Sequence, residues 1–111
     1  TFYNFAINGV ISQEEMEDLY LLLSDTYFNM KDYVSASNEY RRFIQLYPES
    51  LNNDKALFYL AYSMENIQNN PDYKEAFRLY KLLVDKYPES KYRKTGKERM
   101  LHLERHYLKI N

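Results

Sequence analysis

The residues best suited to chemistry lie near the end of the sequence, where Glu98, His102 and His106 follow one another at intervals of four. On a helix this spacing places the three side chains on one face, and two histidines one turn apart can chelate a metal ion. The sequence contains no cysteine and no further histidine to complete such a site. A solvated charged face is therefore the favoured interpretation, and we expect no metal, no cofactor and no catalytic residue.

Positive charges gather just upstream of these residues, at the start of the same predicted helix. A helix N-terminus disfavours cations because the helix dipole places partial positive charge there. This placement indicates either a solvated surface, which is the more common case, or a docking site for an acidic partner. The residues concerned are Lys91, Arg93, Lys94 and Lys97, followed by Arg99.

Composition narrows the classes of function that the sequence allows. Its 15 basic and 16 acidic residues nearly cancel, without the clustered positive excess that nucleic-acid binding requires. The longest uninterrupted apolar run, residues 19–23, is too short to span a bilayer. The absence of cysteine excludes disulfides and leaves the cellular compartment open. No signal-peptide pattern is present, so we expect that any targeting segment has been removed or never existed.

The elements that must position these residues are indicated by an internal repeat with an offset of 40 residues. Such a period is typical of solenoids built from helix–turn–helix units. Several matches at one offset are difficult to obtain by chance. The matching pairs are Asp32-Tyr33 and Asp72-Tyr73, Ala36 and Ala76, Tyr40 and Tyr80, and Tyr47-Pro48-Glu49-Ser50 and Tyr87-Pro88-Glu89-Ser90.

Each repeated residue type has a physical role in a tetratricopeptide unit. Ala36 and Ala76 are small because paired helices must approach closely where they cross. Tyr40 and Tyr80, one turn further along, fill the space between adjacent units. Pro48 cannot continue a helix and ends the second helix of its unit. We therefore predict an all-α tetratricopeptide-repeat α-solenoid with two helix–turn–helix repeats and a C-terminal capping helix.

The predicted helices divide the chain into an N-terminal segment, two repeats and the cap. Ser12 and Glu15 form a capping box, with Ile11 and Met16 spaced as a hydrophobic staple, so the first helix begins near residue 13. Asn70-Pro71 predicts the start of the fourth helix. The segments are residues 1–12, 13–50, 51–90 and 91–111, and helices are expected at 13–29, 32–47, 54–69, 71–87 and 91–109.

The first helices of stacked repeats line the concave face of a solenoid. Several residues predicted there are bulky and apolar, although the core of a single repeat does not require them. They predict a groove that receives an extended or helical peptide on aromatic anchors. The alternative is that they pack against the N-terminal segment or a second copy of the chain. The predicted groove residues are Leu21, Asp25, Phe28, Phe58, Tyr62 and Glu65.

Three stretches of the sequence give it a resemblance to the BamD family over residues 15–108. They are Phe43-Ile44-x-Leu46-x-Pro48, Tyr87-Pro88-x-Ser90-x-Tyr92 and Arg99-Met100-x-x-Leu103, the last on the long helix that follows the second repeat. Members of this family are tetratricopeptide lipoproteins of the machinery that folds β-barrels into the outer membrane of diderm bacteria. The sequence resembles a short form, with fewer repeats than typical members.

The resemblance implies a non-enzymatic scaffold at the periplasmic face of the outer membrane. Its implied partners are the POTRA-bearing barrel-assembly protein and unfolded outer-membrane proteins. It implies contact with the membrane only through a lipid anchor outside this sequence. Two alternatives remain open: another periplasmic tetratricopeptide adaptor of the Tol-Pal type, and a self-associating structural module. The oligomeric state is left open.

Overall fold

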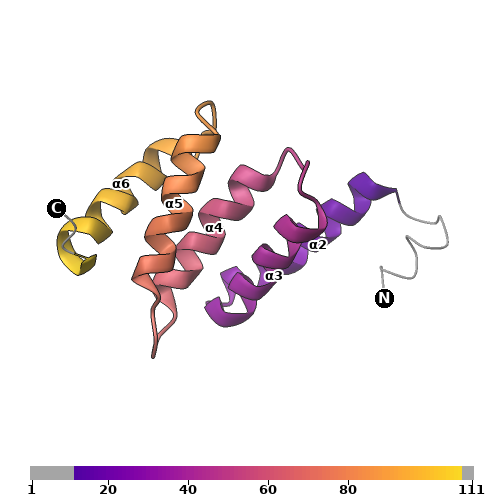
Figure 1. The fold of residues 1–111 in the computed structure, drawn as a ribbon. Coiled ribbons are helices and arrows are strands. Elements are labelled where there is room, and N and C mark those ends of the chain that lie inside the picture. The colour runs from indigo at the N-terminus through magenta and orange to yellow at the C-terminus, as the bar shows by residue number, and fades with distance from the viewer. Residues whose placement is uncertain (1–11, 109–111) are drawn as a thin grey trace.

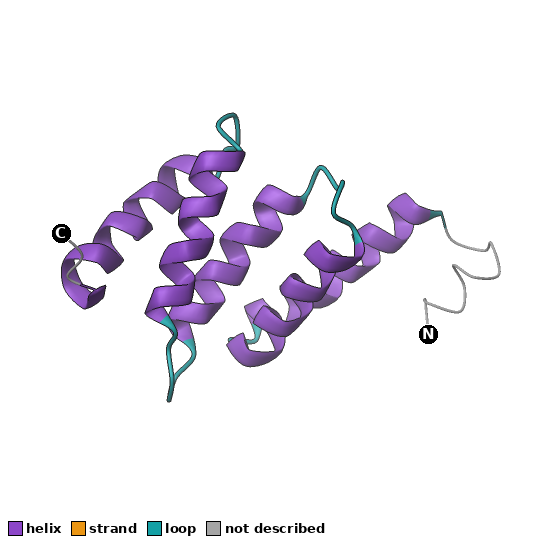
Figure 2. Cartoon of the chain, in the orientation of Figure 1, coloured by secondary structure: helices purple, strands orange, loops and turns teal. Residues whose placement is uncertain are grey.

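Five α-helices and a final π-helical turn make up most of residues 12–108, the part of the chain that the computed structural model describes. No strand occurs in this part (Figure 2). None of its helices combines the length and apolarity needed to cross a membrane. The elements are α2 (Gln13–Asn29), α3 (Tyr33–Leu46), α4 (Asn53–Asn66), α5 (Tyr73–Lys86), α6 (Arg93–Leu103) and η1 (Glu104–Leu108).

Each helix packs against the next one along the chain, and α2 also contacts α4 (Figure 1). Alternate helices therefore share a layer, with α2, α4 and α6 on one side and α3 and α5 on the other. The stack measures 52 × 32 × 18 Å, and α2 and α6 lie at its opposite ends. The predicted all-α solenoid of two helical hairpins followed by a C-terminal capping helix, α6, is confirmed.

The repeated residues occupy equivalent places in the two hairpins. Ala36, Ala76, Tyr40 and Tyr80 are all fully buried, as close helix crossings and inter-unit filling require. Asp32 and Asp72 cap α3 and α5, each accepting a hydrogen bond from the backbone N–H three residues later. The sequence matches therefore reflect matching packing and capping positions.

The start of α2 agrees with the prediction, whereas the start of α5 differs from it. The capping box of Ser12 and Glu15 forms at the start of α2, whereas Ile11 and the rest of residues 1–11 lie outside the described residues. The Asn70-Pro71 prediction is wrong, because Asp72 is the N-cap of α5 and Pro71 belongs to the preceding loop. The backbone N–H of Asp72 donates to the carbonyl of Met64, which holds that loop against the end of α4.

Two helices are also shorter than predicted. The third predicted helix ends at Asn66 rather than near residue 69, because the inserted residues form the loop before Asp72. The predicted last helix ends its α-helical part at Leu103 and continues as the π-helix η1. The wider π-turn brings Tyr107 onto the ring of Tyr73, with centroids 4.0 Å apart. Tyr107 is 50% exposed, so it does not continue the buried face of α6.

Candidate functional site

Three of the six predicted groove residues do not line an open groove. Leu21, Phe58 and Glu65 are buried, and this part of the prediction is corrected. The reason is that the junction between successive repeats uses these side chains itself. Phe58 packs against the rings of Tyr80 and Tyr92, at centroid distances of 5.9 and 5.3 Å.

Asp25 belongs to a polar network at the first junction, where repeat 1 meets α4. The hydroxyl of the buried Tyr40 donates a hydrogen bond to one carboxylate oxygen of Asp25. Lys55 Nζ, from α4, lies 2.8 Å from the other oxygen. Burial, followed by the hydrogen bond to Asp25, raises the pKa of Tyr40. We call Tyr40, Asp25 and Lys55 the first network.

Glu65 occupies the corresponding role at the second junction, where repeat 2 meets α6. The hydroxyl of Tyr80 donates to Glu65 Oε2 at 2.6 Å, and Arg99 donates to both carboxylate oxygens. Burial and then the charge of Glu65 raise the pKa of Tyr80, while the hydrogen bond to Glu65 raises that of Arg99. We call Tyr80, Glu65 and Arg99 the second network.

The remaining predicted groove residues, Phe28 and Tyr62, are half-buried beside Asp25. Phe28 contacts the rings of Tyr59 and Tyr62 at centroid distances of 4.8 and 5.6 Å. A small cavity of about 160 Å³ opens next to them, lined by Asp25, Phe28, Asn29, Lys55 and Tyr59. What remains open on this layer is therefore a notch between α2 and α4.

The predicted basic docking residues divide into two groups. Arg93 is half-buried, and its Nε donates to the carbonyl of Val84 at the end of α5. Lys91 lies over the ring of Tyr92, with Nζ 5.4 Å from the centroid. Lys94 and Lys97 are exposed and line a cavity of about 420 Å³. Arg93 thus supplies a hydrogen-bond donor to a backbone carbonyl in the last turn of α5, whereas Lys94 and Lys97 project from the outer side of α6.

The two histidines lie together where α6 continues into η1, with His102 on α6 and His106 on η1. The rings of His102 and His106 have centroids 4.5 Å apart. Among residues 12–108, no group of three or more His, Cys, Asp or Glu side chains is arranged to hold a metal ion. The described part of the chain thus gives the pair no further ligands.

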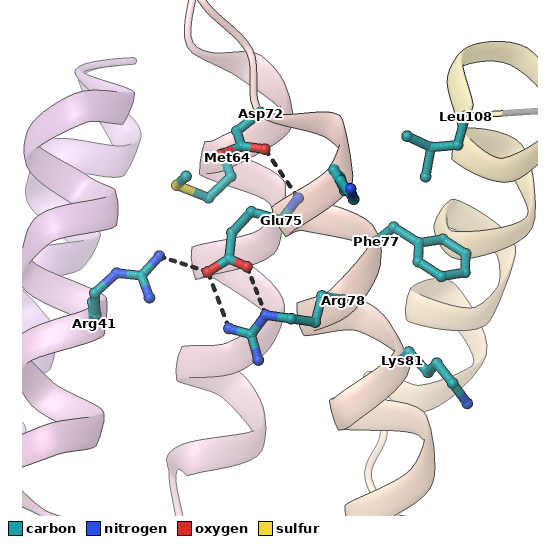
Figure 3. A pocket seen from close by; sticks show the side chains of 9 residues that line it. Arg41, Met64, Asp72, Glu75, Phe77, Arg78, Lys81 and Leu108 are labelled. Carbon is teal, nitrogen blue, oxygen red and sulfur yellow. Dashed lines mark hydrogen bonds and ion pairs between the residues drawn. The ribbon is translucent and has the colours of Figure 1, made fainter.

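A surface cavity of about 610 Å³ lies on the other layer, and the sequence reasoning did not identify it (Figure 3). The sequence does contain a pattern that could have indicated this cavity. The spacing of three and four residues between Lys74, Phe77, Arg78 and Lys81 places all four on one face of α5. Leu108 of η1 and Arg41 of α3 flank that face (Figure 3). We call this cavity the α5 pocket, lined by Arg41, Met64, Asp72, Lys74, Glu75, Phe77, Arg78, Lys81 and Leu108.

Glu75 is the electrostatic centre of the α5 pocket. Its carboxylate accepts two hydrogen bonds from Arg78, at 2.6 and 3.0 Å, and one from Arg41 Nη2 at 3.2 Å (Figure 3). The hydrogen bond from Arg78 is the main cause that lowers the pKa of Glu75. The acid thus holds two arginines from neighbouring helices beside the pocket.

Comparison with known proteins gives one family. The model of the YfiO family, described as an outer membrane lipoprotein, matches residues 11–108. No protein in the curated set gives a significant match. The matched range includes both hairpins, both networks and the α5 pocket.

Proposed function

Because this chain belongs to the YfiO family of BamD-like outer membrane lipoproteins, we propose that it is a scaffold that binds protein partners during the assembly of β-barrels in that membrane. The proposed partners are the POTRA-bearing barrel-assembly protein and unfolded barrel substrates. The proposed site of action is the periplasmic face. The observation that carries the proposal is the family match over residues 11–108.

The architecture supports binding rather than catalysis. The YfiO family is a non-catalytic family associated with outer membrane assembly. In the described residues, Asp25 and the buried Glu65 each hold a tyrosine and a cation together, so both carboxylates are used in packing. A two-layer helical stack of this kind offers partners an extended surface on each layer. The proposed role therefore needs no reacting group, only surfaces with defined shape and charge.

Two surfaces remain from the sequence-based proposal. The notch lined by Asp25 and Phe28, with Tyr62 packed on Phe28, offers half-buried aromatic rings to an extended substrate segment. Lys94 and Lys97 offer exposed positive charge to an acidic partner on the outer side of α6. We propose the first as a substrate contact and the second as a contact with an assembly partner.

The test is affinity capture of this chain from cross-linked membranes of its source organism, with the bound proteins identified by mass spectrometry. We expect recovery of a POTRA-containing barrel protein, reduced by the Lys94→Glu/Lys97→Glu variant. The single variant Lys97→Glu is compared with Lys86→Glu, which makes the same change of charge at the end of α5. Recovery of Tol-Pal or cell-wall components alone would instead identify a different periplasmic adaptor.

Self-association is a second candidate, favoured by the distribution of charge along the stack. The first turns of α2 carry Glu14, Glu17 and Asp18, next to the exposed Leu22, whereas the outer side of α6 is basic. Opposite charges at the two ends allow head-to-tail contact between copies. Sedimentation over a range of concentrations and salt tests this. A monomer at every concentration removes the candidate.

A further inference from the structure

The α5 pocket has an apolar floor that no described part of the chain covers. Phe77 projects from α5 toward Leu108 of η1, and Met64 adds a thioether from the end of α4 (Figure 3). All three side chains are half-buried, packed on one side and open on the other. At about 610 Å³, the cavity falls in the size range of ligand sites in proteins.

The rim of the α5 pocket carries an excess of positive charge. Four cations line it (Arg41, Lys74, Arg78 and Lys81), against the two acids Asp72 and Glu75. One carboxylate oxygen of Asp72 is used in capping α5, and Glu75 is shared between two arginines. The acids are thus committed to the protein itself. Lys74 and Lys81 are exposed, and Lys81 is in an exposed ion pair with Asp85 at 3.0 Å, which water screens. An approaching ligand meets an apolar surface edged by cations.

The spacing of these groups matches a short stretch of extended peptide. From Lys74 to Lys81 the helix axis rises by about 10 Å, at about 1.5 Å per residue. An extended chain advances about 3.3 Å per residue, so about three residues cover that distance. One bulky side chain over Phe77 then has neighbours that reach Lys74 on one side and Lys81 on the other.

From this arrangement we propose that the α5 pocket docks an acidic peptide segment that inserts one bulky apolar side chain against Phe77 and Leu108. The inference rests on the proposed scaffold function and adds a specific partner chemistry to it. The apolar anchor supplies affinity by displacing water from the floor of the pocket. The flanking carboxylates select orientation and raise the rate of association through the cationic rim.

The proposal is tested with fluorescently labelled synthetic peptides and the full chain, by anisotropy titration. The first peptide has one phenylalanine flanked by glutamates on both sides. The second replaces that phenylalanine by alanine, and the third replaces the glutamates by lysines. We expect the first to bind about tenfold more tightly than either of the others, with affinity that falls as salt rises. Equal affinities for the first two peptides would mean that the phenylalanine contributes nothing to binding, and would overturn the proposal of an apolar anchor.

Variants of the chain locate the binding. Phe77→Ala and Lys74→Glu should each weaken the first peptide by about tenfold or more. Lys86→Glu is the matched control, since it makes the same charge change at an exposed lysine of α5 outside the pocket and should leave the affinity within about twofold. Equal losses from Lys74→Glu and Lys86→Glu would show unspecific charge attraction and overturn the proposal. Because Phe77 also contacts the core, urea unfolding of Phe77→Ala accompanies the titration, and Lys74→Glu keeps the test decisive if that variant is unstable.

Two further measurements separate this proposal from other occupants and from the scaffold function itself. Vesicles containing anionic lipid should not compete with the first peptide, and full competition would indicate a membrane surface as the ligand instead. The membrane capture is repeated with Lys74→Glu. If the unchanged chain captures barrel-assembly proteins but binds none of the three peptides, the scaffold function stands and the docking proposal falls. If it binds the first peptide selectively but captures no assembly protein, the docking proposal stands and the scaffold function falls.

Discussion

The two junctions of the stack each provide a hydrogen-bond acceptor for a buried tyrosine hydroxyl, but they use different residues. In each, a fully buried tyrosine of the second helix in a repeat donates to an acid of the first helix, and a cation from the following repeat or cap completes the contact. The acid at the first junction is Asp25, whose side chain is 30% exposed, and at the second it is Glu65, at 4%. The second network therefore depends more on its own partners and less on water.

The difference follows from a shift in helical register. Ser24 and Ala61 are the corresponding small residues of α2 and α4, so the position matching Asp25 in the second repeat holds Tyr62. Glu65 lies almost one turn further along α4. Its cation has moved in the same direction, because Arg99 follows the position matching Lys55, which is Thr95, by one turn. The comparison teaches that the tyrosine position is fixed while the charges that satisfy it can move together along the helices.

Removal of the cations gives the largest expected contrast between the junctions. Arg99→Met leaves Glu65 buried without a countercharge and should cost about 3 kcal/mol of unfolding free energy. Lys55→Met should cost less than about 1 kcal/mol, because water reaches Asp25. Urea unfolding at neutral pH measures both, with an unchanged m-value as the sign of an unchanged unfolding transition. Equal losses would mean that the two networks are equivalent despite their difference in exposure.

Alkaline pH should weaken both junctions through their tyrosines. The folded-state pKa values of Tyr40 and Tyr80 are raised above the usual value of 10. Their contribution is therefore complete below about pH 10 and is lost as pH rises further, because the unfolded chain then releases protons that the folded chain retains. Each group should remove about 1.4 kcal/mol of unfolding free energy per pH unit in that range. Tyr80→Phe should reduce the slope by this amount, and an unchanged slope would contradict the assignment.

The hydroxyl groups themselves are tested at neutral pH by the paired variants Tyr80→Phe and Tyr40→Phe. We expect a loss of about 2 kcal/mol for Tyr80→Phe, since a buried carboxylate loses one of its donors. For Tyr40→Phe we expect about 1 kcal/mol, because water can replace the hydroxyl at the partly exposed Asp25. Thermal and urea unfolding both report these losses. A larger loss from Tyr40→Phe would reverse the order of the two networks.

The sequence predicted the parts of the fold that depend on residue type at a fixed spacing. Ala36, Tyr40 and their copies recur because each unit needs a small residue and a large residue at those two positions, and periodicity reveals such needs. The sequence placed the loop after α4 within a few residues of its observed position. It assigned the N-cap of the following helix, α5, to Asn70. The repeat offset points to Asp72 instead, since its counterpart Asp32 caps α3. The repeat was a better guide than the local proline signal.

The candidate site was harder to predict because it depends on contacts between repeats. Phe58 and Tyr62 lie one turn apart on the same face of α4. Only Phe58 is buried, because the rings of Tyr80 and Tyr92 cover it. No spacing within α4 distinguishes the two residues. The α5 pocket likewise requires Leu108, which reaches it through a π-turn that the sequence pattern did not indicate. Exposure at a junction is a property of the assembled stack.

The smallest expected effect concerns how tightly each junction closes. Ala56 of α4 and Gly96 of α6 occupy matching buried positions, each three residues after the first residue of its helix. A Cβ added at Gly96 would lie 2.9 Å from Leu83 Cδ2. At the second junction, the Leu83 side chain therefore occupies space that the side chain of an alanine would need. Gly96→Ala gains about 1 kcal/mol of helix propensity. The movement of the Leu83 methyl offsets part of this gain, so the net change should stay below about 1 kcal/mol.

The reciprocal variant shows whether that closure belongs to the second junction alone. Ala56→Gly should cost about 1–2 kcal/mol, since it loses helix propensity and a buried methyl group without a closer contact to replace them. Urea unfolding of the two single variants and of the double variant measures both changes and their additivity. If Gly96→Ala costs more than Ala56→Gly, Leu83 cannot move aside. The tighter closure at α6 would then be required by the packing around the second network, and glycine would be a necessary residue there rather than a tolerated one.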